Sequence, residues 1–151
     1  MTDALAVLGI IAAFGVAFPT MWWLVLNLIA KAGGWARLAV SFSTDKPPAG
    51  QHFAWRSGTL GWLGNYRNAL QVWVSPQGLW LRPLAIFRPG HATLMIPWTA
   101  IKQVSTRQFV FSIESVIDMR LADGGSASIS LYGKDIADTL VRAAPSTVVR
   151  G

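Results

Sequence analysis

The chain contains no cysteine, and this absence excludes disulfide frameworks, thiolate metal sites and cysteine nucleophiles. It has only two histidines, His52 and His91, which leaves little for a histidine-based metal site. Charged residues make up 13% of the 151 residues, about half the usual share. These shortages exclude a disulfide-stapled secreted domain, a zinc finger, an iron–sulfur protein and a disordered tail.

Apolar residues are abundant instead and form 52% of the chain, which is high for an ordinary soluble domain of this length. Residues 4–30 contain no charged side chain. As a helix rising about 1.5 Å per residue, this run exceeds the hydrocarbon core of a bilayer, about 30 Å thick. The sequence therefore predicts a transmembrane helix over residues 4–30.

A cleaved signal peptide or a buried core helix could also give rise to such an apolar run. Ala30-Lys31-Ala32 has the small-x-small form of a cleavage site. However, no Lys or Arg precedes the run, which is also longer than the h-region of about 7–15 residues in a signal peptide. Trp22, Trp23 and Trp35 accompany Lys31 and Arg37 at its end, the combination that favours the water boundary of a membrane.

Basic residues are concentrated after this helix. Between residues 31 and 107 there are nine Lys or Arg and one acid, Asp45, whereas five acids and four bases follow residue 113. This excess of basic residues after the predicted transmembrane helix predicts that the C-terminal part lies in the cytoplasm, against the bacterial inner membrane. Near an anionic leaflet each basic side chain contributes about 1 kcal/mol, so we expect anionic membrane lipid as a partner.

Residues 31–50 are rich in Gly, Ser, Thr and Pro and are predicted to form a juxtamembrane linker, in which residues 34–42 could begin as a short interfacial helix. Short β runs then alternate with turn residues. Two hairpins are predicted, with turns at residues 75–78 and 123–125, and residues 94–96 and 101–104 add further strands. Residues 136–144 change to helical spacing and end before Pro145, so a helix is expected to cover an antiparallel sheet.

This order of six or seven antiparallel strands and a final helix resembles the pleckstrin-homology (PH) superfold, a bent sheet or barrel capped by its last helix. The pieces VSPQGLWL at 74–81, FRPGH at 87–91 and LMIPWTAI at 94–101 resemble uncharacterised bacterial single-pass membrane proteins with a PH-like (GRAM-like) domain. The resemblance covers about residues 53–143. The chain is accordingly predicted to consist of a transmembrane helix (4–30), a linker (31–50), a PH-like domain (51–145) and a tail (146–151). It implies binding or scaffolding without catalysis. The basic pattern with which PH domains recognise inositol lipids is missing, because Arg56 and Arg67 are too sparse.

Two apolar loops flanked by glycine or arginine are candidate contact sites. Residues 58–64 are expected to form a flexible loop, and residues 82–91 to place apolar side chains between Arg82 and Arg88. Such tips suit the headgroup boundary or a groove on a partner, although they could equally fill the ends of the sheet domain. The predicted contacts with membrane, lipid or partner are Trp22, Trp23, Lys31, Trp35, Arg37, Leu60, Trp62, Leu63, Arg82, Ile86, Phe87 and Arg88.

Catalytic motifs are weak. Glu114 with Asp118, and Asp135 with Asp138, are spaced as carboxylate pairs but suit a solvated strand edge and a helix N-terminus better. There is no nucleophile elbow, and the glycines at 58, 61 and 64 lack the ending of a phosphate-binding loop. We therefore predict no enzyme activity, cofactor or metal, and identify no small-molecule substrate. Nucleic acid is not an expected partner, because no binding motif is visible and a membrane tether limits access.

The sequence thus favours a membrane-anchored scaffold or accessory subunit that binds another integral membrane protein or complex. The alternative is a lipid-binding or lipid-sensing domain.

Overall fold

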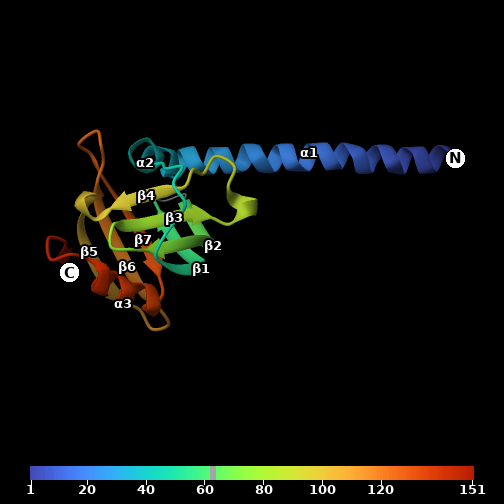
Figure 1. Cartoon of the computed structure of the whole chain (residues 1–151). Coiled ribbons are helices and arrows are strands. Elements are labelled where there is room, and N and C mark those ends of the chain that lie inside the picture. The colour runs from blue at the N-terminus through green and yellow to red at the C-terminus, as the bar shows by residue number, and fades with distance from the viewer. Residues whose placement is uncertain (62–63) are drawn as a thin grey trace.

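The computed structural model describes residues 1–61 and 64–151. It has a long N-terminal helix and a mostly-β domain that ends in a short helix and a two-residue strand (Figure 1). The elements are α1 (Thr2–Ala32), α2 (Trp35–Phe42), β1 (Gln51–Leu60), β2 (Gly64–Val74), β3 (Gly78–Pro83), η1 (Ala85–Phe87), β4 (Leu94–Pro97), η2 (Trp98–Ala100), β5 (Ile101–Gln108), β6 (Ile113–Arg120), β7 (Ser126–Tyr132), α3 (Lys134–Ala143) and β8 (Val149–Arg150).

The strands form one eight-stranded sheet in the order β4-β3-β2-β1-β7-β6-β5-β8. Strands β1 to β7 pair antiparallel, and β8 pairs with β5 in parallel. Both predicted hairpins are confirmed as β2–β3 and β6–β7. The Ser75 hydroxyl accepts hydrogen bonds from the backbone N–H groups of Gln77 and Gly78 in the first turn. In the second turn Gly124 adopts a φ of 85°, which a glycine adopts without strain.

α1 is long and apolar enough to span a membrane. All residues from Met1 to Met21 are exposed, and the helix projects from the domain as a rod (Figure 1). Its last third is different, because Leu26 and Ala30 are buried against the domain. The helix is therefore free over its first two thirds and docked over the remainder.

The segment predicted as a linker contains α2, which is part of the hydrophobic core. Trp35, Leu38 and Phe42 recur at helical spacing and are all buried among side chains of the sheet. Gly34, with a φ of 93°, makes the turn between α1 and α2. The short helix that we expected is present, but its apolar face packs inward.

The expectation of a flexible loop is wrong for residues 58–60 and 64, which lie in strands. β1 continues through Leu60, and Gly58 pairs with both Tyr66 of β2 and Leu131 of β7. A Cβ atom at Gly58 would lie 2.9 Å from the carbonyl oxygen of Ser130, so this glycine permits close strand approach. Leu60 is consequently a core residue. Trp62 and Leu63, predicted in the same loop, lie outside the described residues.

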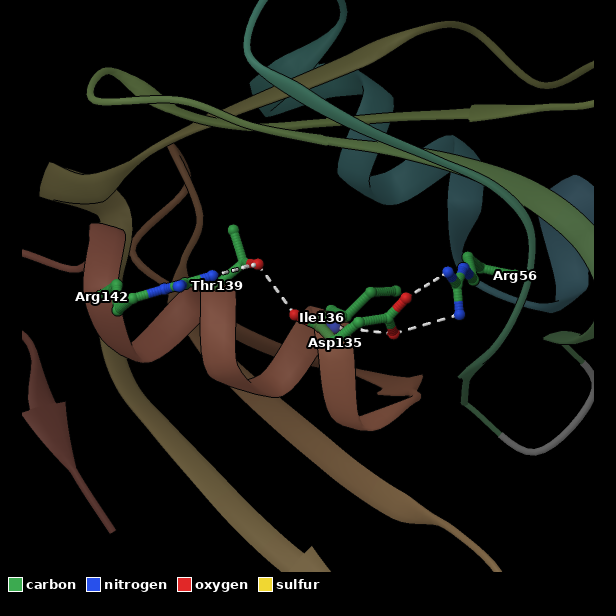
Figure 2. Close-up of polar contacts among 5 residues, drawn as sticks. All are labelled: Arg56, Asp135, Ile136, Thr139 and Arg142. Atoms are coloured by element: carbon green, nitrogen blue, oxygen red, sulfur yellow. Dashed lines mark hydrogen bonds and ion pairs between the residues drawn. The ribbon is translucent and has the colours of Figure 1, made fainter.

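α3 is held on the sheet by its apolar face and by an ion pair at its first turn. Its apolar face buries Ile136 and Leu140 in the core. At its first turn Asp135 receives two hydrogen bonds from the guanidinium of Arg56 in β1, and the same carboxylate accepts the backbone N–H of Ile136 at 2.9 Å (Figure 2). A carboxylate near a helix N-terminus also interacts favourably with the helix dipole. The predicted terminal helix is confirmed, and its attachment explains the role of Asp135.

The residues predicted as a tail also contact the domain. Val148 is buried in the core, and β8 adds to the sheet beside β5.

Candidate membrane and partner contact surface

The docked part of α1 begins at Trp22. Its indole N–H donates a hydrogen bond of 2.7 Å to the carbonyl oxygen of Ile86, and its ring lies 5.7 Å from that of Phe87. Both partners belong to η1, which lies beside α1 on the side of the domain from which the helix projects (Figure 1). Trp22 therefore fixes the point at which α1 leaves the domain.

A second junction, the aromatic triad of Trp35, Tyr66 and His91, connects α2, β2 and the loop before β4. The three ring centroids lie 5.2 to 5.5 Å apart in edge-on arrangements. The Tyr66 hydroxyl lies 2.9 Å from Nε2 of His91, and the Trp35 indole donates to the carbonyl oxygen of Ala92 at 2.9 Å. These directional contacts between buried groups fix α2 relative to the sheet.

Burial governs ionisation in the aromatic triad. Burial raises the pKa of Tyr66 above its ordinary value, so its hydroxyl stays protonated as a donor. Burial lowers the pKa of His91, and a backbone hydrogen bond to Pro89 opposes this shift in part. A neutral His91 that donates from Nδ1 to the Pro89 carbonyl accepts the Tyr66 hydroxyl at Nε2, so this tautomer satisfies both nitrogens.

The predicted contact residues separate into three groups. Trp23, Lys31, Arg37, Ile86 and Arg88 are exposed, with Ile86 at 64% of its full exposure. Trp22, Phe87 and Arg82 are partly buried. Trp35 and Leu60 are buried in the core, so the expectation that they are surface contacts is wrong. The spacing of Trp35 with Leu38 already indicated an apolar helix face, but that face packs on the sheet and not on lipid.

Arg82 contributes more to packing than its position in a loop suggested. It lies in β3, and its guanidinium carbon stands 5.0 Å from the centre of the Trp73 ring, an arrangement that allows a cation–π interaction. Desolvation and the positive charge of Arg88 lower its pKa. Arg88 itself donates from Nε to the Pro83 carbonyl at 3.2 Å. Of these two arginines, Arg88 is the more available to an external anion because it is exposed.

Sequence reasoning missed an apolar surface at the β5–β6 turn, which we name the hairpin tip (Phe109, Val110 and Phe111). Val110 and Phe111 are 90% and 98% exposed, and Phe109 is also exposed. The backbone N–H of Phe109 donates to the carbonyl oxygen of Ser112 and closes the turn. The tip lies at the edge of the domain away from α1 (Figure 1). Its signal in the sequence is three adjacent apolar residues where turn residues are expected.

Three of the four candidate carboxylates, Glu114, Asp118 and Asp135, make hydrogen bonds to other parts of the fold. Asp135 binds Arg56, and Asp118 accepts a hydrogen bond from the Ser128 hydroxyl across β6 and β7. Glu114 lies opposite Arg107 in the β5–β6 register. Among residues 1–61 and 64–151, no three His, Asp or Glu side chains gather closely enough to hold a metal ion.

Exposed Trp23, Ile86 and Arg88 therefore adjoin the Trp22–Ile86 contact where α1 leaves the domain, and a separate apolar tip lies at the edge of the domain away from α1 (Figure 1). No protein-family model, curated protein or solved structure matches the chain.

Proposed function

We propose that the chain is a single-pass protein of the bacterial inner membrane whose cytoplasmic domain scaffolds or stabilises other membrane proteins. The domain is PH-like and non-catalytic, and it rests against anionic lipid. The observation that carries this proposal is the docking of the end of α1 onto the domain through Trp22, Leu26 and Ala30.

The length of the free part of α1 supports the proposed membrane placement. Residues 2–21 precede Trp22, and at about 1.5 Å per residue they measure about 30 Å, the thickness of the hydrocarbon core. Trp22 and Trp23 then lie at the level of the headgroups, as tryptophans in membrane proteins prefer. Because η1 is bound to Trp22, exposed Ile86 is held at the same level.

Exposed cations at and beyond the end of α1 support contact with an anionic leaflet, with Arg88 directly after η1 and Lys31 about 14 Å beyond Trp22 along the helix. Lys31, Arg37 and Arg88 are exposed, and each contributes about 1 kcal/mol when it lies near the surface of such a leaflet. This electrostatic attraction strengthens the membrane attachment that α1 provides, and it restricts how the domain tilts on the membrane.

The hairpin tip supports a protein partner. Three adjacent exposed apolar residues are unusual on a soluble surface and mark an interaction site. The tip faces away from α1, so a domain fixed to an upright α1 presents it sideways, toward a neighbouring protein (Figure 1).

The strand order supports the PH-like assignment. Strands β1 to β7 form one antiparallel sheet and α3 follows directly, as the resemblance implies. The two-residue strand β8 is an addition after that helix.

Site-specific photo-crosslinking in cells tests the scaffold proposal. A photoreactive amino acid at Val110 of the full-length chain should give a discrete adduct with an integral membrane protein. The same probe at exposed Asp123, in the β6–β7 turn, is the matched control and should give none. A Val110 probe that yields no adduct, together with a monodisperse monomer after purification in mild detergent, would contradict the proposal.

The alternative function, a lipid-binding or lipid-sensing PH/GRAM-like domain, is favoured by the exposure of Ile86 between Arg82 and Arg88. An environment-sensitive dye on Ile86→Cys of the full-length chain discriminates between the two functions in nanodiscs. Salt-sensitive burial of the dye in anionic discs, lost on Arg88→Glu and kept on Arg107→Glu, favours a lipid sensor. If burial of the dye depends neither on lipid charge nor on either variant, the result favours the scaffold function with a protein partner.

A further inference from the structure

A crevice between α1 and the sheet is open beside the point where the helix leaves the domain. Its volume is about 290 Å³, just below the range for small-molecule sites, about 300–1,000 Å³. One wall is α1 and the other is β2, and Phe87 of η1 contributes to the lining. The lining residues are Trp22, Val25, Leu26, Ile29, Asn65, Tyr66, Arg67, Ala69 and Phe87.

The chemistry of the lining suits an anionic amphiphile. The α1 wall is entirely apolar, and the hydroxyl of Tyr66 is already hydrogen-bonded to His91. Arg67 is exposed and supplies the charge of the crevice, which has no acidic side chain among its lining residues. A guanidinium binds a phosphate oxygen pair in a bidentate manner, whereas apolar walls accept hydrocarbon.

The position of the crevice indicates where its ligand comes from. Val25 and Ile29 lie on the same helix as the free, membrane-length segment, one to two turns beyond Trp22. A lipid that rises about 10 Å out of the leaflet along α1 therefore brings the upper part of one acyl chain into the crevice, while the rest of the chain stays in the hydrocarbon core. The volume accommodates a segment of one chain and leaves the headgroup outside, beside Arg67.

We propose that this crevice binds one anionic phospholipid of the inner leaflet, with an acyl chain against Val25 and Ile29 and its phosphate on Arg67. The proposal rests on the membrane placement proposed above for α1. It assigns the site a role as a lipid clamp that fixes the angle between helix and domain, because the bound chain fills the space between α1 and β2.

Native mass spectrometry of the full-length chain, released from mild detergent after titration with phosphatidylglycerol or phosphatidylethanolamine, tests the clamp. One phosphatidylglycerol should be retained at least about tenfold more strongly than phosphatidylethanolamine, a difference of about 1.4 kcal/mol. Arg67→Gln should abolish this preference. Arg107→Gln, which removes another exposed arginine that lies in β5 and does not line the crevice, should leave it intact.

A second variant tests the apolar wall independently of the charge. Val25→Trp fills the crevice from the α1 side and should reduce retention of both lipids, while circular dichroism reports that the fold is kept. Equal retention of the two lipids, or a preference that survives Arg67→Gln, would overturn the clamp. The scaffold proposal would survive that result, because it depends on the topology of α1 and on the hairpin tip.

Discussion

Two apolar segments that adjoin arginine residues differ in how far other parts of the protein cover them. Residues 82–88 carry Leu84, Ala85, Ile86 and Phe87 between arginines, and residues 107–111 place the hairpin tip after Arg107. In the first segment Phe87 is partly covered by Trp22, and the Ile86 carbonyl is hydrogen-bonded. In the second, the side chains project beyond the sheet with Phe111 at 98% exposure.

The difference shows that composition alone does not distinguish a loop that packs against a helix from a loop that is exposed to solvent. The first segment lies beside α1, where the Trp22 indole both covers it and binds its backbone acceptor. The second lies at the far edge, where the described residues offer no such cover (Figure 1). We therefore expect substitutions at the junctions of α1 and α2 with the sheet to reduce stability, and substitutions at the hairpin tip to reduce binding.

The largest effect is expected at the aromatic triad. Trp35→Ala removes a fully buried ring and its hydrogen bond to Ala92, and should lower the free energy of unfolding by about 3–5 kcal/mol. Urea denaturation of the full-length chain in mild detergent measures this loss. Val40→Ala, at an exposed position of the same helix, is the control and should change stability by less than about 0.5 kcal/mol. Similar losses for the two variants would show that α2 is not part of the core.

His91→Gln should be the next most destabilising change, at about 1–3 kcal/mol near neutral pH, because it disturbs two hydrogen bonds of a buried group. The lowered pKa of His91 gives this effect a pH dependence. Below about pH 6.5 the unfolded chain binds a proton that folded His91 resists, so the wild-type protein loses stability as the pH falls.

The glutamine variant lacks that proton-linked loss. The stability difference between wild type and His91→Gln should therefore shrink between about pH 7.5 and pH 5 in the same urea titrations. A difference that stays constant over this range would contradict a buried, neutral His91.

A smaller effect is expected at the base of α1. Trp22→Phe keeps an aromatic ring beside Phe87 but loses the donor to the Ile86 carbonyl, and should cost about 0.5–1.5 kcal/mol. Its neighbour Trp23 is exposed, so Trp23→Phe provides a matched control that should leave the melting temperature in detergent unchanged. Equal melting temperatures for the two variants would remove the distinction between the docked and free faces of α1.

The smallest effect on stability is expected at the hairpin tip. Phe111→Ser replaces a side chain that is almost fully exposed, so the free energy of unfolding should change by less than about 0.5 kcal/mol. The same variant should nevertheless weaken the crosslink from a photoreactive residue at Val110. A clear loss of stability would mean that the tip contributes to the fold and is not a free contact surface.

Patterns that depend on neighbours in the sequence predicted much of the fold. The alternation of Ala127, Ile129 and Leu131 identified β7, and the stripe of Ile136 and Leu140 identified α3. The turns at residues 75–78 and 123–125 followed from local backbone preferences of Pro, Gly and Asp. Local patterning also predicted α1, because its residues 4–30 are uncharged.

Contacts between distant residues could not be predicted in this way. Leu60 was expected at an exposed tip because glycines flank it, but Gly58 permits β1 to approach β7, and this pairing buries Leu60. Trp35 was assigned to the membrane interface because tryptophan suits both interface and core. Its partners Tyr66 and His91 lie far along the chain from it, and no local signal connects them.

Single-cysteine labelling tests the membrane placement of α1 most directly, and the absence of native cysteine makes each introduced thiol a unique reporter. Thr2→Cys, Phe14→Cys and Val110→Cys are treated in spheroplasts with a membrane-impermeant maleimide. The account predicts labelling of residue 2 in intact spheroplasts, of residue 110 only after lysis, and of residue 14 only after detergent is added. Labelling of residue 110 in intact spheroplasts, or of residue 14 in native membranes, would contradict it.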